Sequence, residues 1–66
     1  MKVLKIDGEY FADLVSLENV KHVFNEGTTL CVWHHGDAKT DCVRVKMSSY
    51  YDVSSTIEEI YKILNS

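Results

Sequence analysis

The sequence contains no proline, a single arginine and only three glycines, and none of its apolar runs approaches the ~20 residues that a membrane helix needs. The lack of proline favours a continuous chain with short turns. Seven basic residues against ten acidic ones leave a formal net charge of -3, which argues against general attraction to nucleic acid or to an anionic membrane. A chain of 66 residues is expected to form one small domain, residues 1–66, with little room for a deep active site.

Export signals are also lacking. The segment MKVLKIDGEY places Asp7, Gly8 and Glu9 where a secretory signal peptide needs an apolar run. We therefore expect a cytoplasmic protein, in the host cytoplasm if a phage encodes it, with no membrane association. Both cysteines of such a protein are expected to stay reduced.

Two segments in the middle of the chain are predicted to be strands. Thr28 to His35 and Asp41 to Met47 are the clearest strand segments, and they are joined by a hairpin over residues 36–39. Pairing His35 with Thr40 sets a register that gathers one apolar face, made of Leu30, Val32, Val43, Val45 and Met47. The opposite face then carries Cys31, Trp33, Cys42, Arg44 and Lys46.

The end of the chain predicts a helix. Ser55 and Glu58 match a capping box, in which two side chains satisfy backbone donors at the start of a helix. Apolar residues then recur at helical spacing, at Ile57, Ile60, Tyr61 and Leu64. This stripe is expected to cover the apolar face of the sheet.

The N-terminal half is less uniform. Two short runs, residues 3–6 and 9–12, flank Asp7-Gly8, which predicts a two-residue hairpin turn. Residues 16–25 fit either a helix or a strand that ends in a three-residue loop at Asn25-Glu26-Gly27. We favour a helical turn from Ser16 to Asn19 followed by a strand. The fold class is therefore α+β, a small antiparallel β-meander of about five short strands with a C-terminal amphipathic helix on one face.

A helix on one side leaves the other face of the sheet open. That face carries Trp33 and Arg44, residue types typical of interface hot spots, beside two soft thiols. Alternatively, Tyr10 or Phe11 of the N-terminal hairpin covers the tryptophan and makes it part of the core. Tyr50 and Tyr51 lie in a polar linker, residues 48–52, of the composition that adaptable binding loops use. The predicted partner-binding residues are Trp33, Arg44, Tyr50, Tyr51, Cys31 and Cys42.

Metal and thiol chemistry have weak support. The hairpin concentrates potential ligands, but adjacent His34 and His35 point to opposite faces of a strand and no paired-cysteine knuckle is present. Cys31 and Cys42 are diagonal neighbours in the predicted register, roughly 7–8 Å apart, so they are expected to be free thiols. We expect no cofactor and keep a hairpin metal or thiol site only as a minor alternative.

Catalysis and nucleic-acid binding also lack a pattern. No nucleophile is accompanied by a base and an orienting partner in a known local signature, and Gly8, Gly27 and Gly36 each read as turn residues rather than as a phosphate loop. We therefore do not expect an enzyme. Basic residues are scattered among acidic ones, so nucleic acid is not expected as a partner.

Two likenesses add to this interpretation. The order of an Asp7-Gly8 hairpin, Leu17-Glu18-Asn19-Val20, two strands and a terminal amphipathic helix resembles small flagellar-accessory proteins of the FlbD type. The chain departs from them in its longer hairpin at residues 36–41 and its linker at residues 48–54, and no residue role is transferred. Short, acidic chains without motifs also resemble the accessory proteins with which bacteriophages block host machinery, anti-defence inhibitors included.

These observations favour a non-catalytic binding module. We expect it to dock on a larger protein or protein complex and to regulate or inhibit that partner by occupancy. The alternative is a structural homodimer, or a flagellar-accessory-like protein, that uses an open sheet face or an edge strand.

Overall fold

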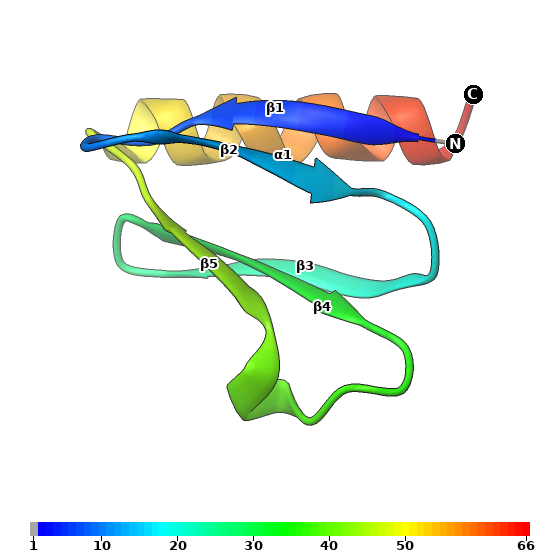
Figure 1. The fold of residues 1–66 in the computed structure, drawn as a ribbon. Coiled ribbons are helices and arrows are strands. Elements are labelled where there is room, and N and C mark those ends of the chain that lie inside the picture. The colour runs from blue at the N-terminus through cyan, green and yellow to red at the C-terminus, as the bar shows by residue number, and fades with distance from the viewer. Residues whose placement is uncertain (1) are drawn as a thin grey trace.

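The computed structural model describes residues 2–66 of the chain. Within that range it contains five strands, one short 3-10 helix and one α-helix (Figure 1), which are β1 Val3–Asp7, β2 Ala12–Ser16, β3 Val20–Glu26, β4 Thr29–His34, η1 Lys39–Asp41, β5 Val43–Lys46 and α1 Tyr50–Leu64. All strand pairs are antiparallel, in a two-stranded sheet β1-β2 and a three-stranded sheet β3-β4-β5. The predicted α+β class, with a C-terminal helix after an antiparallel meander, is confirmed.

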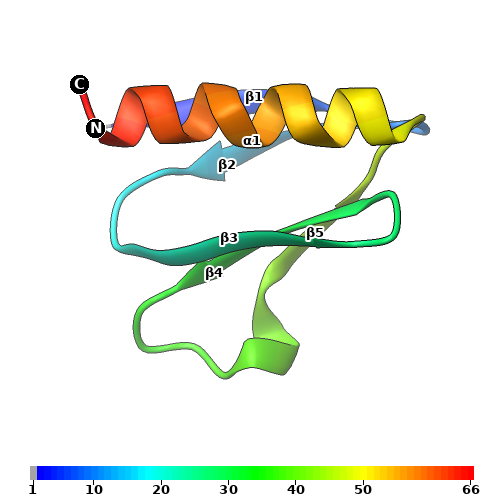
Figure 2. The same ribbon diagram turned by 180° about the vertical axis from the view of Figure 1, so that it is seen from behind.

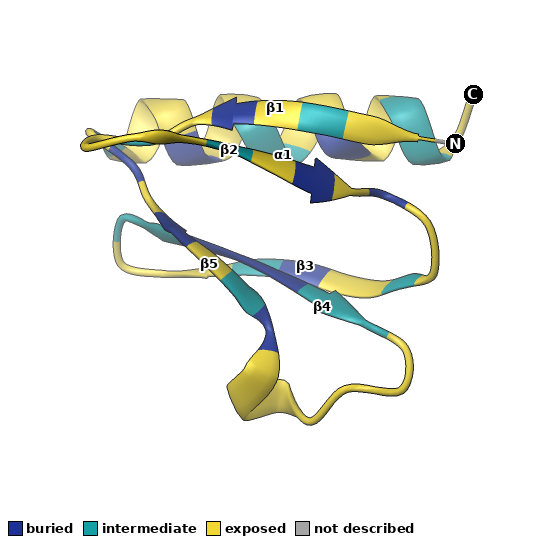
Figure 3. Cartoon of the chain, viewed as in Figure 1, coloured by how far each residue is buried: buried dark blue, intermediate teal, exposed yellow. Residues whose placement is uncertain are grey.

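One core joins the two sheets and the helix. The inner faces of both sheets and one side of α1 meet in a single cluster (Figure 3) of Ile6, Val15, Leu17, Val23, Leu30, Val32, Val45, Met47, Val53 and Ile60. Helix α1 contacts β3 and β4 and runs along the β1-β2 hairpin (Figure 2). Burying one such aliphatic side chain stabilises the fold by roughly 1.5–3 kcal/mol, so residues from all three layers stabilise one another.

The predicted register of the two central strands is confirmed. Leu30 pairs with Val45 and Val32 with Val43, and all except Val43 are buried. The predicted continuation to His35 and Thr40 is wrong, because the β4-β5 pairing ends at Val32 and Val43 and residues 35–42 form a loop with η1. That loop turns back on the sheet, with Gly36 at φ +94°.

The N-terminal hairpin differs from the prediction in its turn. Asp7 pairs with Ala12, so the loop comprises residues 8–11 and is not a two-residue turn. Gly8 lacks a positive φ and is needed for another reason: a Cβ there would lie 2.8 Å from the Lys46 carbonyl oxygen. The backbone N–H of Glu9 donates to that same carbonyl at 2.7 Å. The loop is therefore fixed against the end of β5.

Residues 16–25 resolve into a turn and a strand. The favoured helical turn from Ser16 to Asn19 is wrong: β2 extends to Ser16, and the turn that follows holds Asn19 at φ 60°. Asparagine tolerates this left-handed conformation better than most residues. The strand that was predicted to follow the turn is confirmed as β3. Its hairpin loop is the shorter pair Gly27-Thr28, because Glu26 already pairs with Thr29, and Gly27 has the expected left-handed φ of 61°.

Helix α1 begins earlier than predicted. Its N-cap is Ser49, whose hydroxyl accepts from the N–H of Asp52 at 3.2 Å, so the predicted start at Ser55 is wrong. The earlier start adds Val53 to the buried side of the helix and extends the apolar stripe. Tyr50 and Tyr51 consequently lie in the first turn of α1 and not in a linker.

The chain ends lie beside each other. The Lys2 ammonium donates to the carbonyl oxygen of Ile63 at 3.2 Å, and Figure 1 shows the start of β1 and the end of α1 at the same end of the fold.

Candidate interaction surfaces

The face of the three-stranded sheet that points away from the core forms one continuous surface. Strand alternation and the observed pairing place on it His22, Phe24 and Glu26 of β3, Thr29, Cys31 and Trp33 of β4, and Arg44 and Lys46 of β5, with Cys42 just before β5. We call this surface the outer sheet face. Four of the six predicted contact residues belong to it, namely Trp33, Arg44, Cys31 and Cys42.

Trp33 is half-buried and already has partners. Its indole N–H donates to the backbone oxygen of Asp37 at 2.8 Å, and the Lys21 ammonium lies 4.1 Å from its ring centroid. The alternative in which the N-terminal hairpin covers this ring is wrong, because Tyr10 and Phe11 are 77% and 62% exposed. The loop after β4 and a lysine therefore cover the tryptophan, in a cation-π contact of the kind worth about 0.5–1 kcal/mol at exposed sites.

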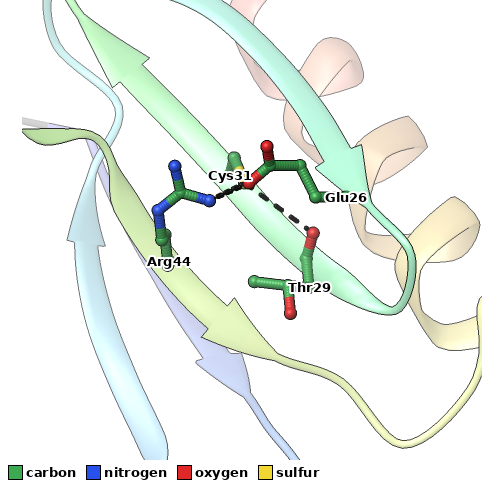
Figure 4. A network of polar contacts seen from close by, with 4 residues as sticks. All are labelled: Glu26, Thr29, Cys31 and Arg44. Atoms are coloured by element: carbon green, nitrogen blue, oxygen red, sulfur yellow. Dashed lines mark hydrogen bonds and ion pairs between the residues drawn. The ribbon is translucent and has the colours of Figure 1, made fainter. Parts of the chain in front are cut away.

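Cys31 lies beneath an ion pair (Figure 4). It has no exposed surface, and its Sγ lies 3.4 Å from an Arg44 nitrogen and 3.8 Å from Oε1 of Glu26. Arg44 is paired with Glu26 and holds the pKa of that carboxyl below its usual range. Burial, reinforced by nearby Cys42, raises the pKa of the Cys31 thiol to about 11. A protonated, covered thiol is a poor nucleophile.

Both cysteines are free thiols, as predicted from the register. Cys42 is buried as well, so the two sulfurs lie under the outer sheet face and not on its surface. Two residues of this face contact side chains from neighbouring segments. The Lys46 ammonium donates to the hydroxyl of Thr28. The Lys39 ammonium lies 5.3 Å from the ring centroid of Phe24.

Four exposed aromatic side chains come from two segments at one end of the fold. Tyr10 and Phe11 in the β1-β2 loop and Tyr50 and Tyr51 in the first turn of α1 are each at least 62% exposed. The contact between Glu9 and Lys46 fixes the loop near the start of the helix, and Figures 1 and 2 show both segments at one end of the molecule. We call these four residues the aromatic end.

Sequence reasoning found only half of the aromatic end. It named the two tyrosines of α1 but placed Tyr10 and Phe11 in the N-terminal hairpin, where one alternative had either of them covering Trp33. The signal that was available is the adjacency of two aromatic residues, because neighbours in a strand point to opposite faces and only one can reach a core.

The structure does not bring all predicted contact residues together. The start of α1 lies near the beginning of β4, because Thr29 pairs with Lys46, the last residue of β5 before the helix. Trp33 lies four residues further along β4, which is about 13 Å of extended chain from Thr29. The predicted contacts therefore divide between the outer sheet face and the aromatic end.

The histidines are dispersed. His22 stacks on Phe24 with ring centroids 5.6 Å apart, and a ring nitrogen of His34 lies 2.7 Å from the backbone oxygen of Ser16. Among residues 2–66 no three His, Cys, Asp or Glu side chains are grouped so that they could share a metal ion. Within the same range, no helix has the length and apolar character needed to cross a membrane.

Comparison with models of known protein families finds no match to the chain. Curated proteins likewise provide no match, and neither do solved structures. The functional argument therefore depends on the surfaces described above.

Proposed function

We propose that the chain is a non-catalytic protein-binding module that docks on a larger protein or protein complex and regulates it by occupancy. The observation that carries this proposal is the aromatic end. Four large aromatic side chains lie mostly in water at one end of a small acidic domain. Tyrosine and phenylalanine bury much apolar area on binding at a small cost in side-chain entropy. Clustered exposure of this kind is typical of protein interfaces.

The chemistry of the outer sheet face supports a non-catalytic role. Its one fully buried thiol has a raised pKa, and its guanidinium is engaged by Glu26. A nucleophile needs the opposite environment, namely a lowered pKa and access to a substrate. Inhibition of the partner follows from occupancy of its surface alone, which is the mode of action of the phage accessory proteins that the chain resembles in size and charge.

The test is affinity capture from a lysate of the encoding host, followed by mass spectrometry. Wild-type protein is compared with Phe11→Ser, Tyr51→Ser and Trp33→Ser, each checked for folding by circular dichroism. We expect one partner to be retained by the wild type and by Trp33→Ser and lost from the two aromatic-end variants. Loss from Trp33→Ser alone would contradict the aromatic end and assign docking to the outer sheet face.

A homodimer is the second candidate. It is favoured by the outward face of β1-β2, where Leu14 is 71% exposed and Val3 is 46% exposed. Sedimentation equilibrium of the wild type and of Leu14→Lys tests it. A concentration-dependent dimer that this substitution abolishes would establish self-association, and a 7.6 kDa species throughout would exclude it.

A further inference from the structure

A cleft of about 450 Å³ lies between β1 and α1. One wall is formed by residues 4–8 of β1 and its following glycine, and the other by Asp52, Ser55, Thr56 and Glu59. These four helix residues follow the spacing i, i+3, i+4, i+7, so they share one face of α1. Met47 and Ser48 line the cleft where the chain enters the helix. We call this cleft the strand groove.

The wall on the β1 side is an unpaired strand edge. Within residues 2–66 β1 pairs only with β2. The bonds Leu17 N–H to Lys2 O and Gly8 N–H to Phe11 O show that even-numbered residues face β2 with their backbone groups. Because direction alternates along an antiparallel strand, the N–H and C=O groups of Val3, Lys5 and Asp7 point to the opposite edge. This edge can accept another strand.

Helix α1 forms the other wall of the strand groove, against which such a strand would pack. A strand added to β1 would have alternate side chains directed at the helix wall of the groove. That wall carries carboxylates at Asp52 and Glu59 with hydroxyls between them. Complementary side chains are therefore basic, and they recur at every second position.

We propose that the strand groove binds an extended polypeptide segment that adds to the free edge of β1 and carries lysine or arginine at alternate positions facing α1. The inference rests on the proposed binding function and specifies the chemistry of the partner segment. It concerns a site beside the aromatic end, so each site is tested by its own variants.

A second copy of the chain fits this groove less well. Antiparallel pairing of two β1 strands about a two-fold axis places both helices on the same side of the joined sheet. The acidic wall of α1, with Asp52 and Glu59, would then face the same wall of its copy. Like charges at an interface oppose association, and both copies carry a net charge of -3.

The probe is a synthetic peptide of alternating lysine and threonine, seven residues long, acetylated and amidated. Seven extended residues span about 23 Å, enough to cover all of β1. Binding is followed by two-dimensional NMR of the labelled protein. We expect saturable shifts at the amides of Val3, Lys5 and Asp7 and at Glu59. A peptide with glutamate in place of lysine is expected to bind at least tenfold more weakly, as is one N-methylated along its pairing edge.

Two matched pairs of variants separate the groove from general charge attraction. Lys5→Pro removes a donor from the free edge of β1, whereas Leu14→Pro removes the corresponding donor from the far edge of β2, since these residues pair opposite each other. Glu59→Gln removes a carboxylate from the groove, and Glu58→Gln removes its neighbour on another face of α1. We expect at least tenfold weaker binding for Lys5→Pro and several-fold weaker binding for Glu59→Gln, with both controls at wild-type affinity.

Four results would overturn the proposal. Equal losses in Glu58→Gln and Glu59→Gln would indicate diffuse charge attraction. Shifts that map to the outer sheet face would place the peptide elsewhere. A dimer of the free chain that Lys5→Pro abolishes would assign the groove to a second copy. Failure of the peptide to bind while host capture still depends on the aromatic end would reject the groove and leave the proposed function intact.

Discussion

At the residue scale, Gly8 shows how one position can serve a distant contact. Its hydrogen atom faces the Lys46 carbonyl and a Val45 methyl, and the contact brings together segments nearly forty residues apart in the chain. An Asp-Gly pair ordinarily predicts a turn with positive φ, and here that local rule gives the wrong loop. The reason for the glycine is tertiary, so it cannot be read from neighbouring residues.

Gly8→Ala is therefore expected to lower the free energy of unfolding by about 1–3 kcal/mol, because a new methyl group overlaps backbone that is fixed at both ends of the contact. Urea unfolding measures the change. Gly27→Ala is the control: it adds a Cβ in open space but at φ 61°, so it costs only about 1–2 kcal/mol of backbone strain. An unchanged midpoint for Gly8→Ala would contradict the close approach.

Cys31 makes stability depend on pH in one direction. Its pKa rises from 9.0 to about 11 on folding because burial disfavours the thiolate. The unfolded chain therefore loses this proton first, and stability falls as pH rises from about 9 to about 11. Urea unfolding of wild type and Cys31→Ala at these pH values isolates the contribution. We expect the free energy of unfolding to fall less between these pH values in Cys31→Ala than in the wild type. Equal falls in the two proteins would show that the Cys31 thiol is not the cause.

At the scale of elements, helix α1 has two serines that could begin it. Ser55 with Glu58 matches the capping box more closely in sequence, yet Ser49 is the cap. What decides between them is packing: starting at Tyr50 buries Val53 in the same stripe as Ile60. Tyr50 and Tyr51 are exposed and do not belong to the apolar stripe of the helix. A search for that stripe in the sequence therefore places the helix start too late.

Ser49→Ala is expected to reduce stability by about 0.5–2 kcal/mol, since an N–H in the first turn loses its acceptor. Ser55→Ala is the matched control, because an exposed serine inside a helix makes no cap and alanine has the higher helix propensity. Thermal unfolding followed by circular dichroism compares them. A larger effect at Ser55 would contradict the observed start of α1.

The strand register was predictable and the strand ends were not. Val43 and Val45 alternate with Arg44 and Lys46, and the pairing that puts them opposite Val32 and Leu30 gathers the aliphatic residues on one face, so period and burial define the register. The end of the pairing is decided by a loop that turns back to bond the Trp33 indole. The strand groove was also outside the reach of sequence reasoning, because it requires knowing which edge of β1 faces α1.

At the scale of the whole molecule, the two sheets share a core but no ladder among the strand pairs of residues 2–66. Their connection is side-chain packing from both sheets onto α1, together with the Glu9–Lys46 backbone bond and the His34–Ser16 contact. We therefore expect unfolding to be a single cooperative transition in which neither sheet survives the loss of the helix contact.

Ile60→Ala tests this expectation. The side chain is fully buried in the shared core, and its truncation is expected to cost about 2–5 kcal/mol, a large share of the stability of so small a domain. Amide hydrogen exchange should accelerate equally in β1-β2 and in β3-β5. Faster exchange in one sheet alone would show that the two sheets unfold separately.

Lys2 contacts Ile63, so residues near the two ends of the described chain lie close together. We therefore expect the fold to tolerate a change in the order of its elements along the chain. A short glycine-serine linker joining residues 2 and 66, with new ends opened in the exposed loop at residues 36–38, gives a circular permutant that retains every strand pair and the helix. The start of β1 and the end of α1 also lie away from the aromatic end, so a fluorescent or affinity fusion attached beside them leaves the proposed docking residues clear.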